Sequence, residues 1–253
     1  MKKKIIENIK TLFYALIIAL IIRSFFFQPF YIPSSSMEPN LLIGDRLFVS
    51  KYTYGYSRHS LPFSPNFSNK RFLSKIPKRG DVVVFKTPAD NRTDYIKRLI
   101  GLPGDEIQFI KGDLYINNEP IKRNQIDSDI IINCGNETLK VNTFEETLPN
   151  GIKYLAVYRE EGSILNTDNF VVPDSHFFFL GDNRDCSKDS RFLSSVGYVN
   201  FNNLVGKARF LFFSNDIKKG SFFKFWKLNQ SLRFKRFFKK IKWKKNFQSL
   251  KKY

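Results

Sequence analysis

Three consecutive serines lie in a short polar stretch, Gln28–Gly44, that follows directly on a hydrophobic run. Ser36, the last of the three, lies nine residues beyond Phe27, where the apolar run ends, and nine extended residues span at most about 30 Å. A serine hydroxyl becomes an effective nucleophile only with a base, an oxyanion stabiliser and a group that orients the base. Serines beside prolines also form ordinary turns, so the local composition alone favours a linker.

Lys97 is a candidate base within Tyr95–Ile100, a segment whose sequence YIKRLI is typical of a β-strand. Alternation along a strand places Tyr95, Lys97 and Leu99 on one face. A lysine is almost wholly protonated at neutral pH, and full burial can depress its pKa by about 3 to 5 units. The adjacent Arg98 leaves an alternative open, in which the two cations are solvated charges on a surface strand.

Two further alternatives do not use Lys97. The chain contains only two histidines, His59 and His176, and His176 with a serine and an aspartate would form a hydrolase triad. A non-enzymatic reading is a tethered β module whose basic tail binds lipid or nucleic acid.

A cluster of acidic residues and two distant cysteines bear on metal binding. Asp182, Asp185 and Asp189 lack the D-x-D-x-D-G spacing of a calcium loop and alternate with basic residues, so internal ion pairs are expected in place of calcium. Cys134 and Cys186 lie outside any metal-ligand spacing. We therefore expect no metal, no disulfide framework and, by default, free thiols.

The first 27 residues have the composition of a membrane anchor. Residues 1–10 form a basic leader and residues 11–27 are mostly apolar, close to the roughly 17 to 25 residues that a spanning helix needs if Arg23 snorkels to the interface. A cleavable signal peptide would need small residues at its cut site, and Ser-Phe-Phe-Phe follows here instead. The leader lysines predict a single-pass protein with its N-terminus in the cytoplasm and its body outside it. In a bacterium this would be the inner (cytoplasmic) membrane, with the body on its periplasmic or outer face.

Residues 28–216 have the pattern of a mostly β domain with an antiparallel sheet. Short apolar runs bounded by Gly, Pro and Asn predict strands, with Asn117–Asn118 as a hairpin turn. Residues 123–167 form a polar insertion with weak β patterning and no readable function. The expected strands are 41–51, 81–86, 95–100, a hairpin over 107–119, 170–172, 176–180 and 205–213.

The net charge of +19 is concentrated at the C-terminus. Residues 218–253 hold 14 of the 42 Lys and Arg and no acidic residue, so 28 basic residues face 23 acidic ones elsewhere, and a nucleic-acid groove on the domain is not supported. In the tail, 217–253, Phe234, Phe237, Phe238 and Ile241 follow an i, i+3, i+4, i+7 pattern that predicts a basic amphipathic helix on membrane phospholipid. A solvated, disordered tail is the alternative.

Four motifs in this order resemble the type I signal peptidases, the membrane-bound leader peptidases of bacteria. The resemblance covers most of the chain except the insertion and the tail, and it implies a Ser/Lys serine endopeptidase that removes signal peptides from exported preproteins after small residues, with no cofactor and no metal. The motifs are IPSSSMEP at Ile32–Pro39, RGDVVVF at Arg79–Phe85, YIKRLIGLPGD at Tyr95–Asp105 and GDNRDCSKDSR at Gly181–Arg191.

The same resemblance implies roles for individual residues. Ser36 would be the nucleophile and Lys97 the general base, while Ser34 Oγ and the backbone N–H of Ser36 would form the oxyanion hole. Ser187 would hydrogen-bond to Lys97 and orient it. The resemblance assigns support of the last motif to Asp182, Arg184, Asp189 and Arg191, and shallow substrate pockets to Phe30, Ile32, Met37, Tyr95 and Ile96.

Overall fold

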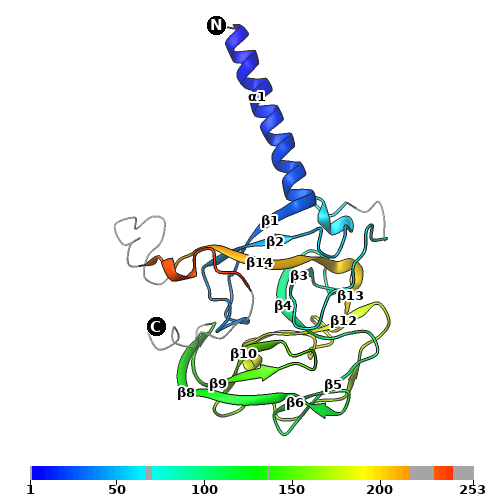
Figure 1. Ribbon diagram of the computed structural model, residues 1–253, viewed down its shortest axis with the longest axis vertical. Helices are drawn as coiled ribbons and strands as arrows, with labels where there is room; N and C mark the ends of the chain where they lie inside the picture. Colours follow the sequence, from blue (N-terminus) through cyan, green and yellow to red (C-terminus); the bar gives the residue numbers. More distant parts are fainter. Residues whose placement is uncertain (1, 66–69, 136, 217–230, 242–253) are drawn as a thin grey trace.

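The computed structural model describes residues 2–65, 70–135, 137–216 and 231–241. Within them the chain is mostly antiparallel β-structure, with one long helix, α1, that projects away from the strands (Figure 1). The expectation of a mostly β fold with a single N-terminal apolar helix is therefore confirmed.

Helix α1 spans Lys2–Ile21 and continues as a π-helical turn over Ile22–Phe26. Its apolar side chains are exposed along most of its length. Residues 3–26 form the one helix in the described part of the chain that is long and apolar enough to cross a membrane. At 1.5 Å per residue these 24 residues reach about 36 Å, which exceeds the hydrocarbon thickness of about 30 Å.

A seven-stranded antiparallel sheet follows the helix, in the order β1-β2-β14-β3-β4-β12-β13. Every strand expected in this part of the chain is present. The sheet contains β1 Phe27–Tyr31, β2 Asp45–Ser50, β3 Val82–Lys86, β4 Asp94–Gly101, β12 His176–Leu180, β13 Val199–Asn200 and β14 Leu204–Ser214.

Two smaller sheets lie at the end of the domain away from α1 (Figure 1). Lys111–Gly112 turns β5 into β6, and the predicted turn Asn117–Asn118 joins β6 to β7 instead. The insertion forms a sheet of its own, β10-β9-β8. The strands are β5 Glu106–Ile110, β6 Asp113–Ile116, β7 Glu119–Pro120, β8 Lys122–Cys134, β9 Glu137–Thr147, β10 Lys153–Arg159 and β11 Phe170–Val171.

The amphipathic helix predicted for the tail is wrong for the described residues 231–241. Apart from the helical backbone of Ser231, the helical structure there is a short 3-10 turn, Phe234–Arg236, and Phe238 adopts a φ of 57°, which interrupts a helix. The segment instead lies along β14, where Leu211 N–H donates to Lys239 O at 2.9 Å and Ile241 N–H donates to Arg209 O at 2.8 Å. The rest of the tail, 217–230 and 242–253, lies outside the described residues.

Candidate active site

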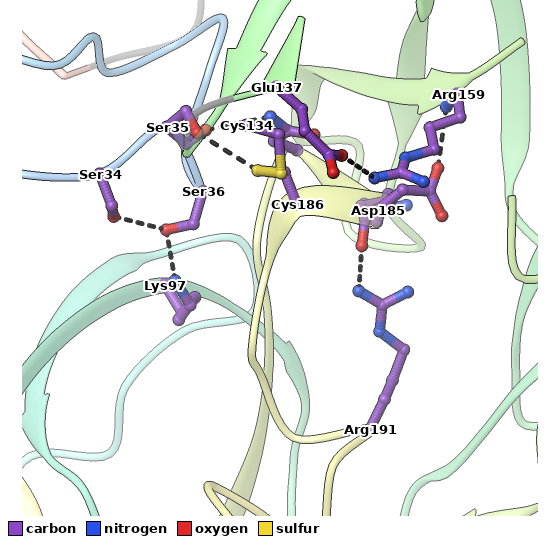
Figure 2. The surroundings of a disulfide bond; sticks show 12 residues. Ser34, Ser35, Ser36, Lys97, Cys134, Glu137, Arg159, Asp185, Cys186 and Arg191 are labelled. Atoms are coloured by element: carbon purple, nitrogen blue, oxygen red, sulfur yellow. Dashed lines mark hydrogen bonds and ion pairs between the residues drawn. A yellow bond between two sulfur atoms is a disulfide. The ribbon is translucent and has the colours of Figure 1, made fainter. Parts of the chain in front are cut away.

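Ser36 and Lys97 come together although 61 residues separate them (Figure 2). Ser36 lies in the loop between β1 and β2, and Lys97 lies in the middle of β4. Lys97 Nζ is 2.5 Å from Ser36 Oγ, and both side chains are buried, with 4% and 6% exposure respectively. The sequence alternative in which Lys97 is a solvated charge does not describe this geometry.

Burial changes the acidity of Lys97. Its strand neighbour Leu99 belongs to a core cluster, Tyr95 packs against that cluster, and Nζ lies 5.5 Å from the centre of the Tyr95 ring. Desolvation lowers the pKa of Lys97 from 10.5 to about 8, while the carboxylates of Asp189 and Asp182 act in the opposite direction. A substantial neutral fraction of the amine therefore exists at mildly alkaline pH.

The three serines point in different directions (Figure 2). Ser34 is exposed, and its Oγ lies 3.3 Å from Ser36 Oγ. Ser35 is buried and turns to the opposite side, where its hydroxyl donates to Cys186 Sγ at 3.3 Å. Of the three, Ser36 is the one hydrogen-bonded to the lysine, and Ser34 is placed beside it at the solvent-facing mouth.

The loop after β12 surrounds this pair because β12 is the neighbour of β4, with Leu180 opposite Arg98. Asp182 binds Arg98 through two contacts, 2.7 Å at Nε and 2.6 Å at the terminal nitrogen, and both side chains are fully buried. Asn40 Nδ2 donates to Asp182 as well, at 2.7 Å. Sequence reasoning missed Arg98 and Asn40, although the adjacency of Arg98 to Lys97 was a usable signal.

Arg184 anchors the same loop to the insertion. Its guanidinium contacts both carboxylate oxygens of Glu146 at 2.8 and 2.6 Å, and it also donates to the hydroxyls of Tyr154 and Tyr158. Burial, the largest effect, would by itself raise the pKa of Glu146, but the Arg184 charge and the hydrogen bonds from Arg184, Tyr154 and Tyr158 together hold the pKa below its ordinary value. Glu146, Tyr154 and Tyr158 lie in an insertion with no readable motif, and nothing in the sequence identified them.

Asp189 pairs with Arg191, as expected for internal ion pairing, and also accepts the Gly181 N–H at 3.0 Å. Ser187 is buried beside Gly181, where a Cβ would lie 2.2 Å from Ser187 Oγ and 2.6 Å from the Ser36 carbonyl oxygen. Only glycine fits at position 181. Ser187 Oγ has no hydrogen-bond partner among the described residues, so the expected bond from Ser187 to Lys97 is not formed in this structure.

The two cysteines are not free thiols, and that expectation is wrong. Cys134 at the end of β8 and Cys186 in the loop after β12 form a disulfide (Figure 2), with their Cα atoms 5.6 Å apart. The pairing arises because the β8–β9 hairpin brings its tip against the loop that surrounds Ser36. It therefore links the insertion covalently to the site.

The five residues expected to line substrate pockets differ in how deeply they are buried. Phe30, Tyr95 and Ile96 are half-buried, whereas Ile32 and Met37 are almost fully buried in the core cluster against which Phe30 and Ile96 pack. The first three can present surface to a ligand. Ile32 and Met37 lie in the core beneath Phe30 and Ile96, whereas Tyr95 packs against a different core cluster.

The histidines contact other groups. His176 Nδ1 lies 2.8 Å from the Asp174 carbonyl and Nε2 lies 3.4 Å from Asn200, while His59 Nε2 accepts from Arg58. None of these partners is a serine or a carboxylate, so the described contacts do not assemble the alternative histidine triad. Among the described residues no group of three or more His, Cys, Asp or Glu is arranged to hold a metal ion.

Comparison with known proteins identifies the family of the chain. Residues 5–213 match the family described as signal peptidase, peptidase S26. The chain is 44% identical over 216 residues to a signal peptidase I of Rickettsia conorii, covering 81% of this chain and 78% of that protein. It is 42% identical over 226 residues to a signal peptidase I of Rickettsia typhi, covering 85% and 83%.

Among solved structures, the crystal structure of a signal peptidase I from Enterococcus faecalis V583 is 27% identical and covers 53% of this chain and 97% of that chain, with a TM-score of 0.30. The family match spans far more than half of the sequence, and the relatives are similar over most of their own length. The chain belongs to the signal peptidase family, peptidase S26.

Proposed function

We propose that this protein is a membrane-anchored serine endopeptidase that removes signal peptides from exported preproteins, with Ser36 as nucleophile and Lys97 as general base. The observation that carries the proposal is the buried contact of 2.5 Å between Ser36 Oγ and Lys97 Nζ in a chain of the signal peptidase family. A neutral lysine at this distance can accept the hydroxyl proton directly.

Acylation follows from that contact. Neutral Lys97 takes the proton of Ser36 as Oγ attacks the scissile carbonyl carbon, and the carbonyl oxygen becomes an oxyanion. Ser34 Oγ, 3.3 Å from the nucleophile, and the Ser36 N–H are the proposed donors to that oxyanion. The Lys97 ammonium then gives its proton to the leaving amine, and the acyl chain remains on Ser36.

Deacylation uses the same groups in the reverse roles. Lys97, neutral again, takes a proton from a water molecule that attacks the ester carbon. The second oxyanion forms in the same place, and the ammonium returns the proton to Ser36 as the ester bond breaks. Ser187, whose buried hydroxyl has no partner among the described residues, is the proposed group that orients Lys97 once substrate is bound.

Substrate selection follows from the apolar surface beside the nucleophile. Phe30, Tyr95 and Ile96 are half-buried and are the proposed walls of pockets for the first and third residues before the scissile bond. Ile32 and Met37, packed in the core beneath Phe30 and Ile96, are the proposed floor of these pockets. Bulky substrate side chains would have to displace core residues, so small residues are preferred.

The anchor and the disulfide support a location in the bacterial inner membrane with the catalytic domain on its outer side. Residues 3–26 can span a bilayer, and the leader lysines favour a cytoplasmic N-terminus. Disulfides such as Cys134–Cys186 form mainly in oxidising compartments outside the cytoplasm. Membrane phospholipid and the signal-peptide region of preproteins are the proposed partners.

The test is cleavage of a preprotein with an Ala-x-Ala site by detergent-solubilised wild type, Ser36→Ala, Lys97→Met and Ser35→Ala, each checked for folding by circular dichroism. We expect Ser36→Ala and Lys97→Met to lose at least about a thousandfold in kcat. Ser35→Ala retains activity because its hydroxyl faces Cys186. Undiminished cleavage by folded Lys97→Met would overturn the proposal.

A further inference from the structure

The segment 231–241 lies beyond the family match, which ends at residue 213. In Figure 1 it runs beside β14, coloured orange to red. The pairing of β3 with β14 ends at Lys207, and the segment bonds to β14 beyond that point, including Arg233 N–H to Ser214 O at 3.0 Å. The C-terminal segment therefore continues the seven-stranded sheet beside β14.

Arg236 is the charged centre of this contact. Its guanidinium binds both carboxylate oxygens of Asp45, at 3.0 and 2.5 Å, and donates to the Asn40 carbonyl at 3.0 Å. Arg236 is 7% exposed and Asp45 is fully buried. Arg233 adds a bond of 2.9 Å to the Ile43 carbonyl, so two arginines hold the stretch from Asn40 to Asp45.

That stretch is the second half of the loop that carries Ser36. Backbone bonds from Asn40 and Leu41 to the Met37 carbonyl, 3.0 and 2.9 Å, connect it to the residue after the nucleophile. The Asn40 side chain reaches in the other direction and donates to Asp182 at 2.7 Å. Asp182 in turn pairs with Arg98, the strand neighbour of Lys97.

Apolar contacts fasten the segment at a second place. Ile241 packs against the core cluster that contains Ile32 and Met37, which flank the three serines. The Phe237 ring packs against Phe213 of β14 in a tilted arrangement, with ring centres 5.3 Å apart. The segment thus contacts the nucleophile loop both through a buried ion pair and through the core beneath it.

We propose that Arg236 is a positioning residue for the reaction, acting through Asp45 and Asn40 to hold the Ser36 loop against the Lys97 strand. The inference rests on the proposed function in one respect, that Ser36 is the nucleophile. It assigns the C-terminal segment a role inside the catalytic domain, distinct from attachment to the membrane. A displacement of about 1 Å at a reacting atom can reduce a rate by about a hundredfold, so a fixed loop matters for turnover.

The experiment compares full-length wild type with Arg236→Met, Arg236→Lys and the matched control Lys235→Met, whose side chain is exposed on the same turn. The substrate is a soluble Ala-x-Ala peptide in detergent without phospholipid, so membrane binding cannot contribute. We expect kcat of Arg236→Met to fall about tenfold or more with KM nearly unchanged, because Arg236 is buried and acts through the Ser36 loop. Arg236→Lys should be intermediate and Lys235→Met normal.

Arg236→Met leaves a buried carboxylate unpaired and can destabilise the fold. The double variant Arg236→Met/Asp45→Asn removes that charge, and we expect it to regain thermal stability while kcat stays low, since the bond to the Asn40 carbonyl is still absent. If Arg236 had a purely structural role, kcat of the double variant would be restored along with its stability. That result would overturn the proposal.

Amide hydrogen exchange of residues 33–45 is the readout that does not depend on activity. Exchange should be faster in Arg236→Met and in the double variant, and unchanged in Lys235→Met. If wild type fails to cleave the peptide, the proposed function fails, and the exchange result still decides whether Arg236 fixes the loop. The positioning role would be refuted if Arg236→Met and the double variant both kept the kcat and the exchange rates of wild type. It would also be refuted if Arg236→Met lost cleavage only of a preprotein embedded in liposomes.

Discussion

At the scale of single residues, the charges around Lys97 are already paired among themselves. Asp182 is bound by Arg98 and Asp189 by Arg191, so each carboxylate that would stabilise an ammonium at Lys97 has a nearer cation. Desolvation then dominates, and the pKa of Lys97 falls to about 8. The ion pairs of the loop after β12 thus help to keep the proposed base neutral.

The pH dependence of cleavage should report this pKa. About a tenth of Lys97 is neutral at pH 7 and about nine tenths at pH 9 if the pKa is about 8. We therefore expect kcat/KM for a soluble Ala-x-Ala peptide to rise about tenfold between these two pH values, because kcat/KM follows the ionisation of the free enzyme. Initial-rate assays across pH 6 to 10 would locate the inflection in kcat/KM.

Glu38 supplies the control for that profile. Burial raises the pKa of Glu38 to about 7, and this residue lies two positions after Ser36, so it titrates in a neighbouring range. The variant Glu38→Gln should keep the inflection near pH 8. An inflection that disappears in Glu38→Gln would assign the profile to the carboxyl group instead of Lys97.

Replacing the buried lysine should stabilise the protein at neutral pH. The difference between pKa values of 10.5 unfolded and about 8 folded means that the buried ammonium opposes folding by about 3 kcal/mol below pH 8. Lys97→Met removes that opposition but also removes the hydrogen bond from Lys97 to Ser36, which costs about 1 kcal/mol. Urea unfolding should show a net gain of about 2 kcal/mol at pH 7.

The sign of this effect can be checked with pH. Between pH 8 and 10.5 the unfolded lysine keeps its proton while the folded one loses it, so wild type gains stability as pH rises and the advantage of Lys97→Met shrinks. Ser36→Ala is the matched control because it keeps the lysine. A Lys97→Met protein less stable than wild type at pH 7 would contradict this account.

At the scale of elements, the loop after β12 is held from four sides. Two of its residues form ion pairs, Asp182 with Arg98 on β4 and Arg184 with Glu146 on β9. Cys186 is bonded to Cys134 of β8, and Asn183 makes hydrogen bonds to the serine loop. The Asn183 N–H donates to the Ser36 carbonyl at 3.1 Å and its side chain donates to the Ser35 carbonyl at 3.2 Å. The insertion therefore supports the site from outside the large sheet.

Removing the disulfide should destabilise the catalytic domain. Cys134 and Cys186 are 52 residues apart, and closing a loop of this length is worth about 2 to 4 kcal/mol through the entropy of the unfolded chain. We expect Cys134→Ser/Cys186→Ser to melt at a lower temperature than wild type, and a dithiol reductant to bring wild type down to the same value. The reductant should leave the double variant unchanged.

Thiol titration tests whether the disulfide is present. Wild type unfolded without reductant should show no reactive thiol, since both cysteines of the chain are paired. Two reactive thiols under those conditions would mean that the bridge is absent.

At the scale of the whole molecule, the anchor and the site are placed close together along the chain. Helix α1 leads through the π-helical turn directly into β1, and the loop after β1 carries Ser36. Tyr56 donates to the Phe25 carbonyl at 2.9 Å and Lys51 N–H donates to the Phe26 carbonyl at 3.0 Å, so the end of the helix is tied to the β domain. A membrane-embedded substrate would reach the site over a short distance.

The predicted orientation can be tested in spheroplasts that express the full chain. Proteinase K added outside should degrade the catalytic domain and leave a short membrane fragment that contains α1, because the leader lysines retain the N-terminus in the cytoplasm. A cytoplasmic marker protein must stay intact as the control. Protection of the catalytic domain until lysis would reverse the orientation.

The sequence by itself predicted the strands and the long apolar N-terminal helix, while the roles of Ser36 and Lys97 came from the resemblance of its motifs to the type I signal peptidases. Period-2 alternation, turn residues and a long apolar run are local properties, and they do not require knowledge of what packs on them. Alternation also placed Tyr95, Lys97 and Leu99 on one face of β4. It could not show that the opposite face, with Arg98, is buried as well, because that depends on what covers the sheet.

Only the tertiary structure decided the contacts between distant segments. Cys134 and Cys186 form a disulfide because the end of the β8–β9 hairpin contacts the loop after β12. Arg184 forms an ion pair with Glu146, which lies in an insertion that contains no recognisable motif. The spacing of apolar residues in the tail predicted a helix, yet burial of Ile241 against the core and the pairing of Arg236 with Asp45 favour an extended path beside β14. The local sequence shows which residues are apolar, whereas the contacts between distant segments decide which part of the protein buries them and in what backbone conformation.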